Sequence, residues 1–164
     1  MMALMLGEPK YGYQLKREAG WMTGEDPLHN NIVYPMLRRF LDDGLVSKKA
    51  VPGERGQTRQ QYALTAQGRR VFFERMNSFT DDDAASDDAF RLRLGIFEEL
   101  KAESREAILA KREQYLERRD QRLENLQGQM ELGRFGGEIV RYMRKQIATE
   151  RDWIRHLRRM EKNI

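Results

Sequence analysis

The stretch of sequence that decides the fold is residues 28–68, LHNNIVYPMLRRFLDDGLVSKKAVPGERGQTRQQYALTAQG. In its first part, apolar side chains recur at helical spacing, which predicts a short amphipathic helix with one face packed on a core. These apolar positions are Val33, Leu37, Phe40, Leu41 and Leu45. The opposite face carries Asn31, Tyr34, Arg38 and Asp42. That face is therefore free to contact another molecule.

The ends of this helix are marked by residues with restricted backbone chemistry. Proline has no backbone N–H and is tolerated in the first turn of a helix, so Pro35 predicts a start close by. Asn30 or Asn31 is then the predicted N-cap. Asp43-Gly44 predicts the end, because glycine readily adopts the left-handed conformation that follows many last turns.

Two extended segments follow the helix directly. Residues 45–51 and 59–64 predict a pair of strands, joined by a loop at 52–58 whose proline and two glycines suit a turn. Tyr62 and Leu64 alternate with their neighbours, so one side of this ribbon is expected to lie on the helices. Thr65 is the predicted N-cap of the next helix. A helix, a basic-tipped ribbon and a helix in this order predict a winged helix-turn-helix domain that binds DNA.

Three motifs in order resemble the PadR family of transcriptional regulators: EPKYGYQL at 8–15, VYPMLRRFLDDGLV at 33–46 and RQQYALTAQG at 59–68. The family pattern has a glycine-tyrosine pair that opens the second helix and an aromatic-proline pair in the recognition helix. It continues with a glycine before the first strand and a tyrosine, then leucine-threonine-x-x-glycine, after the wing. The matching positions are Gly12-Tyr13, Tyr34-Pro35, Gly44, Tyr62, Leu64-Thr65 and Gly68. Tyr11 departs from the pattern, since many members carry histidine there.

The resemblance covers residues 1 to about 77 well and the rest more loosely. RLRLGIFEEL at 91–100 and a final helix with Trp153 resemble the longer helical arm of one PadR subfamily. The resemblance implies a repressor that leaves its operator when an effector, commonly a small aromatic or hydrophobic compound, reshapes the arm. Trp21 and Trp153 are the candidate walls of an effector pocket, although aromatic side chains are more often plain core.

In a winged helix the recognition helix enters the major groove, the wing contacts backbone or minor groove, and the second helix crosses the phosphates. The predicted contacts of the recognition helix are Asn30, Asn31, Tyr34, Arg38 and Arg39, where the two asparagines can both cap the helix and contact DNA. Those of the wing are Arg55, Thr58 and Arg59. Those at the start of the second helix are Lys10, Tyr13 and Lys16.

Composition and charge set outer limits on the architecture. With 164 residues, 40% hydrophobic and 34% charged, the chain fits one compact domain or a small domain plus an appendage. We predict a DNA-binding domain at 1–78 and a helical dimerisation and effector-sensing domain at 79–164. The net charge of +4 lies wholly within residues 1–80, which fits a surface that meets phosphates. No cysteine, signal peptide or long apolar run is present, so a reducing cytoplasm and no membrane are expected.

The second half reads as an acidic segment followed by long helices. TDDDAASDD at 80–88 is either a solvated linker or the acidic first turn of a helix. A helical pattern begins at Phe90, and Ser104 is the predicted N-cap of a second helix that runs to about Glu131. Gly133, Gly136 and Gly137 interrupt it before a last helix. The two long helices should form a hairpin.

This hairpin has more apolar positions than one chain can cover, which predicts a homodimer about a twofold axis. The predicted dimer contacts are Leu109, Leu116, Leu123 and Met130, spaced by seven residues, and Ile139, Met143, Trp153 and Leu157 of the last helix. A twofold dimer would place two recognition helices about one turn of B-DNA apart and require a pseudo-palindromic operator. The overall prediction is a mainly α fold: a winged helix-turn-helix with a two-stranded wing, plus a helical hairpin arm.

Enzymatic chemistry is not predicted. The chain has two histidines far apart, no cysteine, no ligand spacing for a metal and no glycine-rich phosphate loop, so no catalytic residue, metal or cofactor is expected. The alternative function is a winged helix that binds protein or RNA, dimerised through a coiled-coil-like arm, since fold alone does not determine function.

Overall fold

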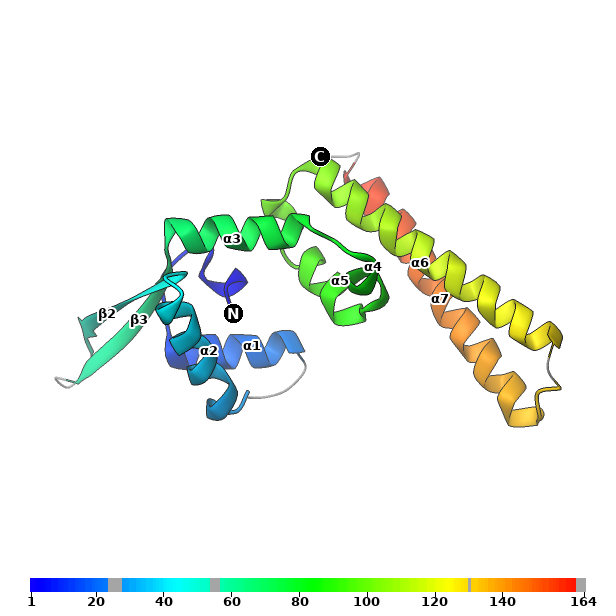
Figure 1. Cartoon of the computed structure of the whole chain (residues 1–164), viewed down its shortest axis with the longest axis horizontal. Coiled ribbons are helices and arrows are strands. Elements are labelled where there is room, and N and C mark those ends of the chain that lie inside the picture. Colours follow the sequence, from blue (N-terminus) through cyan, green and yellow to red (C-terminus); the bar gives the residue numbers. More distant parts are fainter. Residues whose placement is uncertain (24–27, 54–56, 130, 162–164) are drawn as a thin grey trace. The chain divides into compact units, whose positions relative to one another are not determined.

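The computed structural model describes residues 1–23, 28–53, 57–129 and 131–161. Their contacts divide the chain into two units, Met1–Ser78 and Phe79–Ile164. The fold is mainly helical with one small antiparallel sheet, as the sequence predicts (Figure 1). None of the helices described is both long and apolar enough to cross a membrane.

The first unit is built on a three-stranded sheet with β3 at its centre. Its elements are a 3-10 helix Ala3–Met5, β1 Lys10–Tyr11, α1 Gly12–Thr23, α2 Asn30–Asp42, β2 Val46–Pro52, β3 Thr58–Leu64 and α3 Ala66–Asn77. β2 and β3 form the predicted ribbon (Figure 1). The sequence predicts two strands and misses β1, in which Lys10 and Tyr11 pair with Tyr62 and Gln61. Two residues give no periodicity to detect.

Helix α2 begins earlier than its proline suggests. The N-cap residue is His29, whose side chain makes no capping hydrogen bond, and Asn30 and Asn31 lie inside the first turn. The predicted asparagine N-cap is therefore wrong. Pro35 lies in the second turn, where it cannot donate the hydrogen bond that the carbonyl oxygen of Asn31 would otherwise accept.

The end of α2 is the predicted one and forms a Schellman motif. The N–H of Gly44 donates to the carbonyl oxygen of Leu41 at 3.0 Å, and the N–H of Leu45 donates to that of Phe40 at 2.9 Å. Gly44 has φ of +68°, a left-handed conformation that glycine adopts without a Cβ clash. The chain therefore turns from α2 straight into β2.

Helix α3 is held against that turn by two residues. The Thr65 hydroxyl accepts a hydrogen bond from the N–H of Gly68 at 2.9 Å, which confirms Thr65 as the N-cap. The same hydroxyl donates to the carbonyl oxygen of Gly44 at 2.7 Å. A Cβ at Gly68 would lie only 1.9 Å from the carbonyl oxygen of Leu45. The close approach of α3 to this backbone therefore requires glycine.

The core of the first unit fixes which face of α2 is left outside. Its buried side chains are Met5, Leu15, Val33, Leu37, Val46 and Tyr62. Phe40, Leu41 and Leu64 pack against them half-buried, so the predicted apolar faces of α2 and of the ribbon are confirmed. Each fully buried aliphatic or aromatic side chain contributes roughly 1.5–3 kcal/mol, which fixes the rotation of α2.

The second unit consists of helices. Its described elements are α4 Asp81–Ala85, α5 Asp87–Leu94, a 3-10 helix Phe97–Glu99, α6 Ala102–Gln129 and α7 Arg134–Glu161. The acidic segment forms helical first turns and is not a linker. Thr80 and Asp83 form a capping box on α4, and Ser86 caps α5 by accepting from the N–H of Ala89.

Helices α6 and α7 pack side by side as the predicted hairpin (Figure 1). Two details of the prediction are wrong. Ser104 is not an N-cap, since α6 begins at Ala102. Gly136 and Gly137 lie in the first turn of α7, so Gly133 is the glycine in the connection between the helices.

Ion pairs between α6 and α7 run along the hairpin. Arg158 bonds Glu113 at 2.6 Å, Arg144 bonds Asp120 at 2.8 Å, and Arg105 bonds Glu161 at 2.7 Å, each between partly exposed groups. The ion pair of Arg112 with Glu150, at 2.8 Å, is different because the Arg112 side chain is only 1% exposed.

The apolar stripe predicted for dimerisation is divided by the hairpin. Leu109 and Leu116 are buried inside their own unit, so they offer no surface to a second chain in this structure. Leu123, Met143 and Leu157 are half-buried, and Met130 lies outside the described residues. Ile139 and Trp153 are exposed. A seven-residue repeat indicates that a stripe packs on something, and α4, α5 and α7 of the same chain are what α6 meets.

Candidate nucleic-acid interface

The outer face of α2 carries the side chains predicted to enter a groove. Asn31, Tyr34 and Arg38 are all exposed, and Tyr34 is 43% exposed. Asn30 and Arg39 are also exposed, at the first turn and beside Arg38. The buried Val33 and Leu37 lie on the opposite side. A packed inner face thus presents a rigid polar face with aromatic and guanidinium groups, which can donate hydrogen bonds to base edges or phosphates.

A hollow of about 430 Å³ lies beside Tyr34 and connects α2 to the sheet. Its lining residues are Tyr11, Gly12, Tyr13, Tyr34, Arg59, Gln60 and Tyr62. The rings of Tyr11 and Tyr13 stack at 5.8 Å between centroids. The one charged group in this lining is a guanidinium, so the hollow combines phenol hydroxyl groups with positive charge. Such a surface suits a sugar-phosphate backbone.

Gly12 shapes this hollow, because a Cβ there would lie 3.1 Å from the ring of Tyr34. The glycine at the start of α1 therefore leaves room for the tyrosine of α2. Burial is the larger cause, and Tyr34 the smaller, of a rise in the pKa of the Tyr62 phenol above its usual value. Tyr62 is thus a neutral, buried support under the exposed tyrosines.

A second hollow groups three predicted contacts from α1 and α2. Lys16, Asn30 and Asn31 line it together with Leu28 and His29. This places one ammonium group near two amide side chains at the start of α2. The arrangement suits a backbone contact at the edge of a groove.

Lys10 is placed differently from its prediction. Its ammonium group pairs with Glu18 at 3.1 Å and with Glu8 at 3.5 Å. The hydrogen bond with Glu18 is the largest of the interactions that raise the pKa of Lys10. Because two carboxylates already neutralise it, Lys10 has less charge to offer a phosphate than Lys16 or Arg38.

The wing carries further basic side chains. Thr58 is exposed at the start of β3, and Arg59 is half-buried with its side chain against Gly53, while Arg55 lies outside the described residues. Lys48 and Lys49 of β2 are exposed and were missed by sequence reasoning. Two consecutive lysines in the first strand of a wing were the available signal.

Residues 1–74 match the family model described as the transcriptional regulator PadR-like family. This part of the chain is similar to the PadR-like transcriptional regulators, and we call it the PadR-like domain. It contains α2, both hollows and the wing, so the resemblance drawn from the three sequence motifs is confirmed. The comparison with curated proteins found no match.

Several solved structures are similar to this chain. Bacillus subtilis PadR in complex with operator DNA is 14% identical, with a TM-score of 0.46 over 97% of this chain and 94% of that one. The same protein in complex with p-coumaric acid is 15% identical, with a TM-score of 0.42 over 97% and 94%. A PadR family regulator from Eggerthella lenta is 33% identical, with a TM-score of 0.38 over 44% and 64%.

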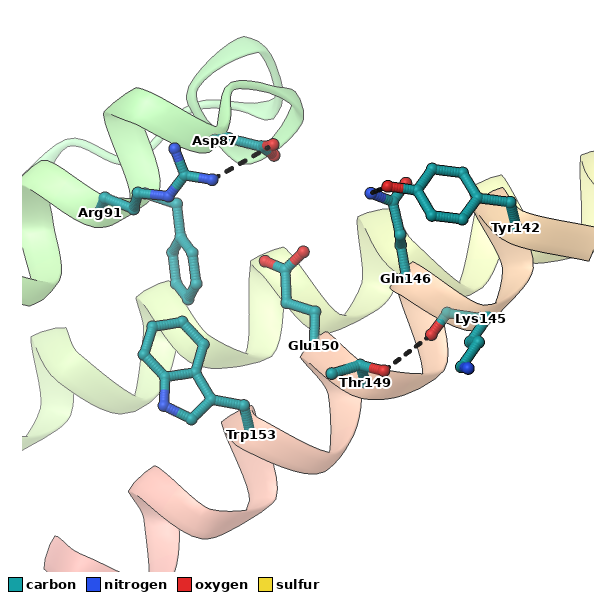
Figure 2. Close-up of a pocket in the computed structure, with 9 residues that line it drawn as sticks. Asp87, Arg91, Tyr142, Lys145, Gln146, Thr149, Glu150 and Trp153 are labelled. Atoms are coloured by element: carbon teal, nitrogen blue, oxygen red, sulfur yellow. Dashed lines mark hydrogen bonds and ion pairs between the residues drawn. The ribbon is translucent and has the colours of Figure 1, made fainter. Parts of the chain in front are cut away.

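Outside the PadR-like domain, the second unit has a cavity of about 480 Å³ between α5 and α7. Phe90 and Trp153 meet edge to face at 6.3 Å between centroids and form its aromatic wall. Trp153 points from α7 into this cavity (Figure 2). The α7 side of the lining is Tyr142, Lys145, Gln146, Thr149 and Glu150, and the α5 side is Asp87 and Arg91 with Phe90. The Gln146 amide donates to the Tyr142 hydroxyl at 3.0 Å.

Arg112 of α6 bonds two of the residues that line this cavity, Glu150 and Asp87. Its guanidinium donates to Glu150 at 2.8 Å and 3.0 Å, to Asp87 at 2.5 Å and to the carbonyl oxygen of Ala84 at 2.6 Å. Burial opposes the charge, yet the hydrogen bonds and charges of Glu150 and Asp87 outweigh it and raise the pKa of Arg112. The guanidinium also lies 5.2 Å from the Phe90 ring centroid. One cation thereby ties together α4, α5 and α7 around the cavity.

The two tryptophans belong to different units. Trp21 lies in the last turn of α1, in the PadR-like domain, and is 62% exposed. The guanidinium of Arg17 lies 5.1 Å from the centroid of its ring. Trp153 lines the cavity of the second unit. Among the residues described, no group of three or more histidine, aspartate and glutamate side chains is placed to hold a metal ion.

Proposed function

We propose that this protein is a sequence-specific DNA-binding transcriptional regulator. The observation that carries the proposal is the exposed polar face of α2, held rigidly by buried Val33 and Leu37 beside a basic wing. The match of residues 1–74 to the PadR-like regulators supports it. The proposed base contacts are Tyr34, Arg38 and Arg39, and Asn30 and Asn31 reach phosphates or base edges at the groove entrance.

The remaining contacts are sequence-independent in this proposal. Tyr13 and Lys16 at α1, and Thr58, Arg59, Lys48 and Lys49 at the wing, meet the phosphate backbone. Arg55 is kept in this set from its place in the sequence of the wing loop. Lys10 acts through its ion pairs and orients the start of α1.

The experiment compares a labelled duplex from the region upstream of the gene with a scrambled duplex of the same composition. The upstream duplex should bind at least about a thousandfold more tightly. Its affinity should fall with salt at a slope of about −0.9 per phosphate neutralised. Equal affinity for both duplexes would favour the alternative of a protein- or RNA-binding adaptor.

We further propose that the protein acts as a homodimeric repressor on a pseudo-palindromic operator. Two recognition helices related by a twofold axis would reach half-sites about one turn of B-DNA apart. Such a dimer is expected to be located in the cytoplasm, where it has access to the chromosome.

A small aromatic or hydrophobic effector is proposed to enter the cavity between α5 and α7. The aromatic pair Phe90 and Trp153 supports a flat ligand, and the volume of about 480 Å³ suits a small molecule. Titrating p-coumaric acid or ethidium, as an anionic and a cationic aromatic probe, into the Trp21→Phe variant should change Trp153 emission. A Trp153 signal unchanged by both probes would count against the cavity, and the Trp21 site would then be tested in the Trp153→Phe variant.

A further inference from the structure

Helix α2 exposes two large apolar side chains that none of the contacts proposed above uses. Ile32 is 44% and Met36 is 36% exposed, whereas Val33 and Leu37, which follow them in the chain, are buried. Residues four apart in a helix are neighbours on its surface, so Ile32 and Met36 form one continuous strip. We call this strip the apolar edge of α2.

Exposure alone does not indicate a function, because many apolar side chains remain exposed on folded proteins. The position of the apolar edge is what distinguishes it. Arg39 follows Met36 by three residues and Ile32 by seven, so its exposed guanidinium group lies on the same side of the helix. The apolar edge is therefore next to a residue proposed to contact bases.

The apolar edge also belongs to the end of α2 that suits a groove. Ile32 and Met36 lie in the first two turns, and the first turn has no acidic residue. The carboxylates of α2 and its C-cap, Asp42 and Asp43, are at the opposite end. In helix-turn-helix proteins the N-terminal residues of the recognition helix contact base edges.

We infer that Ile32 and Met36 contact the C5-methyl groups of thymines in the major groove. Thymine is the base that presents an apolar group there, and apolar side chains recognise it. The amide of Asn31 and the guanidinium groups of Arg38 and Arg39 suit the hydrogen-bonding edges of purines. The inference rests on the proposed function of α2 in DNA recognition, to which it adds two residues that determine specificity.

The two side chains differ in how strictly they should read a methyl group. Isoleucine is branched at Cβ and has one strongly preferred χ1 rotamer in a helix, so Ile32 presents its methyl groups in a fixed place. Methionine is unbranched and adapts to its surroundings. Their Cα atoms are about 6 Å apart along the axis, and base pairs are about 3.4 Å apart. The two thymines should therefore lie within about two base-pair steps of each other.

Replacing thymine by uracil tests the inference, because uracil keeps the pairing and hydrogen-bonding groups of thymine and lacks only the methyl group. Each thymine of the upstream duplex is replaced in turn, and affinity is measured by anisotropy. Wild-type protein should lose about fourfold in affinity at each of two neighbouring positions, the value expected for one buried methyl group. Replacement at the other thymines should leave the affinity unchanged.

Protein variants then assign each methyl group to its side chain. Ile32→Ala should remove the preference for thymine over uracil at one of the two positions, and Met36→Ala should remove it at the other. Because both variants are compared on both duplexes, a change in DNA shape caused by uracil cancels. The matched control is Val71→Ala, since Val71 is an apolar residue of α3 with a similar exposure of 38%. It should keep both preferences.

The outcomes separate this inference from the proposed function. Tighter binding of the upstream duplex than of the scrambled one, with no thymine sensitive to uracil, would contradict the inference and leave the regulator intact. A preference for thymine that persists in both alanine variants would assign the methyl contacts to other side chains and overturn it. Equal affinity of wild-type protein for upstream and scrambled duplexes would overturn the proposed function, and the inference with it.

Discussion

At the scale of single residues, two glycines determine how α2, β2 and α3 are connected in the PadR-like domain. Gly44 takes a left-handed conformation after α2, and Gly68 lets α3 touch the carbonyl oxygen of Leu45. The sequence indicates the first of these, because an Asp-Gly pair ends an amphipathic stretch. The sequence does not predict the contact of Gly68 with Leu45, because these residues are far apart in the chain.

Gly68→Ala should lower the free energy of unfolding by about 3 kcal/mol, the upper end of the range for overpacking, because the new Cβ meets backbone rather than a flexible side chain. Urea unfolding followed by circular dichroism measures this. Gly128→Ala is the control, since nothing lies within 4 Å of its added Cβ in α6. It should raise stability slightly. Equal stability of Gly68→Ala and wild type would contradict the close approach.

Tyr62 should make stability fall at alkaline pH. Its pKa is raised in the folded protein above the usual value of 10.0, so the unfolded chain loses its proton first as pH rises. The unfolded state then binds fewer protons, and the free energy of unfolding decreases above about pH 10. Tyr62→Phe should reduce this slope in unfolding curves taken between pH 8 and pH 11 relative to wild type.

At the scale of elements, the sequence located helices and the wing better than their surroundings. Residues 33–45 predicted the packed face of α2, because the spacing of apolar residues reports burial directly. The start of α2 was missed, because tertiary packing of Val33 and Leu37 outweighs the cost of Pro35 in the second turn. The α6 repeat of Leu109 and Leu116 was assigned to a dimer, since periodicity identifies a packed stripe but not its partner.

The candidate site likewise contains residues that the sequence predicts and residues that only the structure reveals. The motif positions Tyr13, Tyr34 and Arg59 line one hollow in the structure, although they are distant in sequence. Tyr11, Gln60 and Tyr62 complete it and were not predicted as part of the site, because the pairing of β1 with β3 brings them there. Lys10 was predicted as a phosphate contact from its charge, and its carboxylate partners become visible only in three dimensions.

Two substitutions distinguish base recognition by α2 from phosphate contact by the wing. Arg38→Ala should weaken binding to the upstream duplex by roughly 1–3 kcal/mol and relax preference at one base position. Lys49→Ala on the wing should weaken upstream and scrambled duplexes alike and reduce the salt slope by about one. Anisotropy titrations measure both, and an equal loss on both duplexes for Arg38→Ala would remove its role in base recognition.

Substitution of Arg112 tests how much its buried ion pairs stabilise the second unit. Arg112→Ala should lower the free energy of unfolding by about 2–3 kcal/mol, because it leaves Glu150 and Asp87 without their shared cation, though both remain partly in contact with water. Arg112→Met, which keeps the volume, should lose less. Arg144→Ala is the control with a half-exposed ion pair and should cost much less than Arg112→Ala in thermal unfolding.

At the scale of the whole molecule, the central claim is that the polar face of α2 enters a major groove twice in each assembly. In the proposed homodimer the second unit sets the number of α2 helices, and the PadR-like domain sets what each one contacts. Neither half alone specifies an operator, because affinity for phosphates is independent of sequence and one short helix reads few bases.

Hydroxyl-radical footprinting of the upstream region tests this claim most directly. Wild-type protein should protect two patches about one turn of B-DNA apart and related by a dyad, and Arg38→Ala should lose both patches at a concentration where wild type is saturating. A single patch, or two patches that Arg38→Ala protects as well as wild type does, would contradict the account.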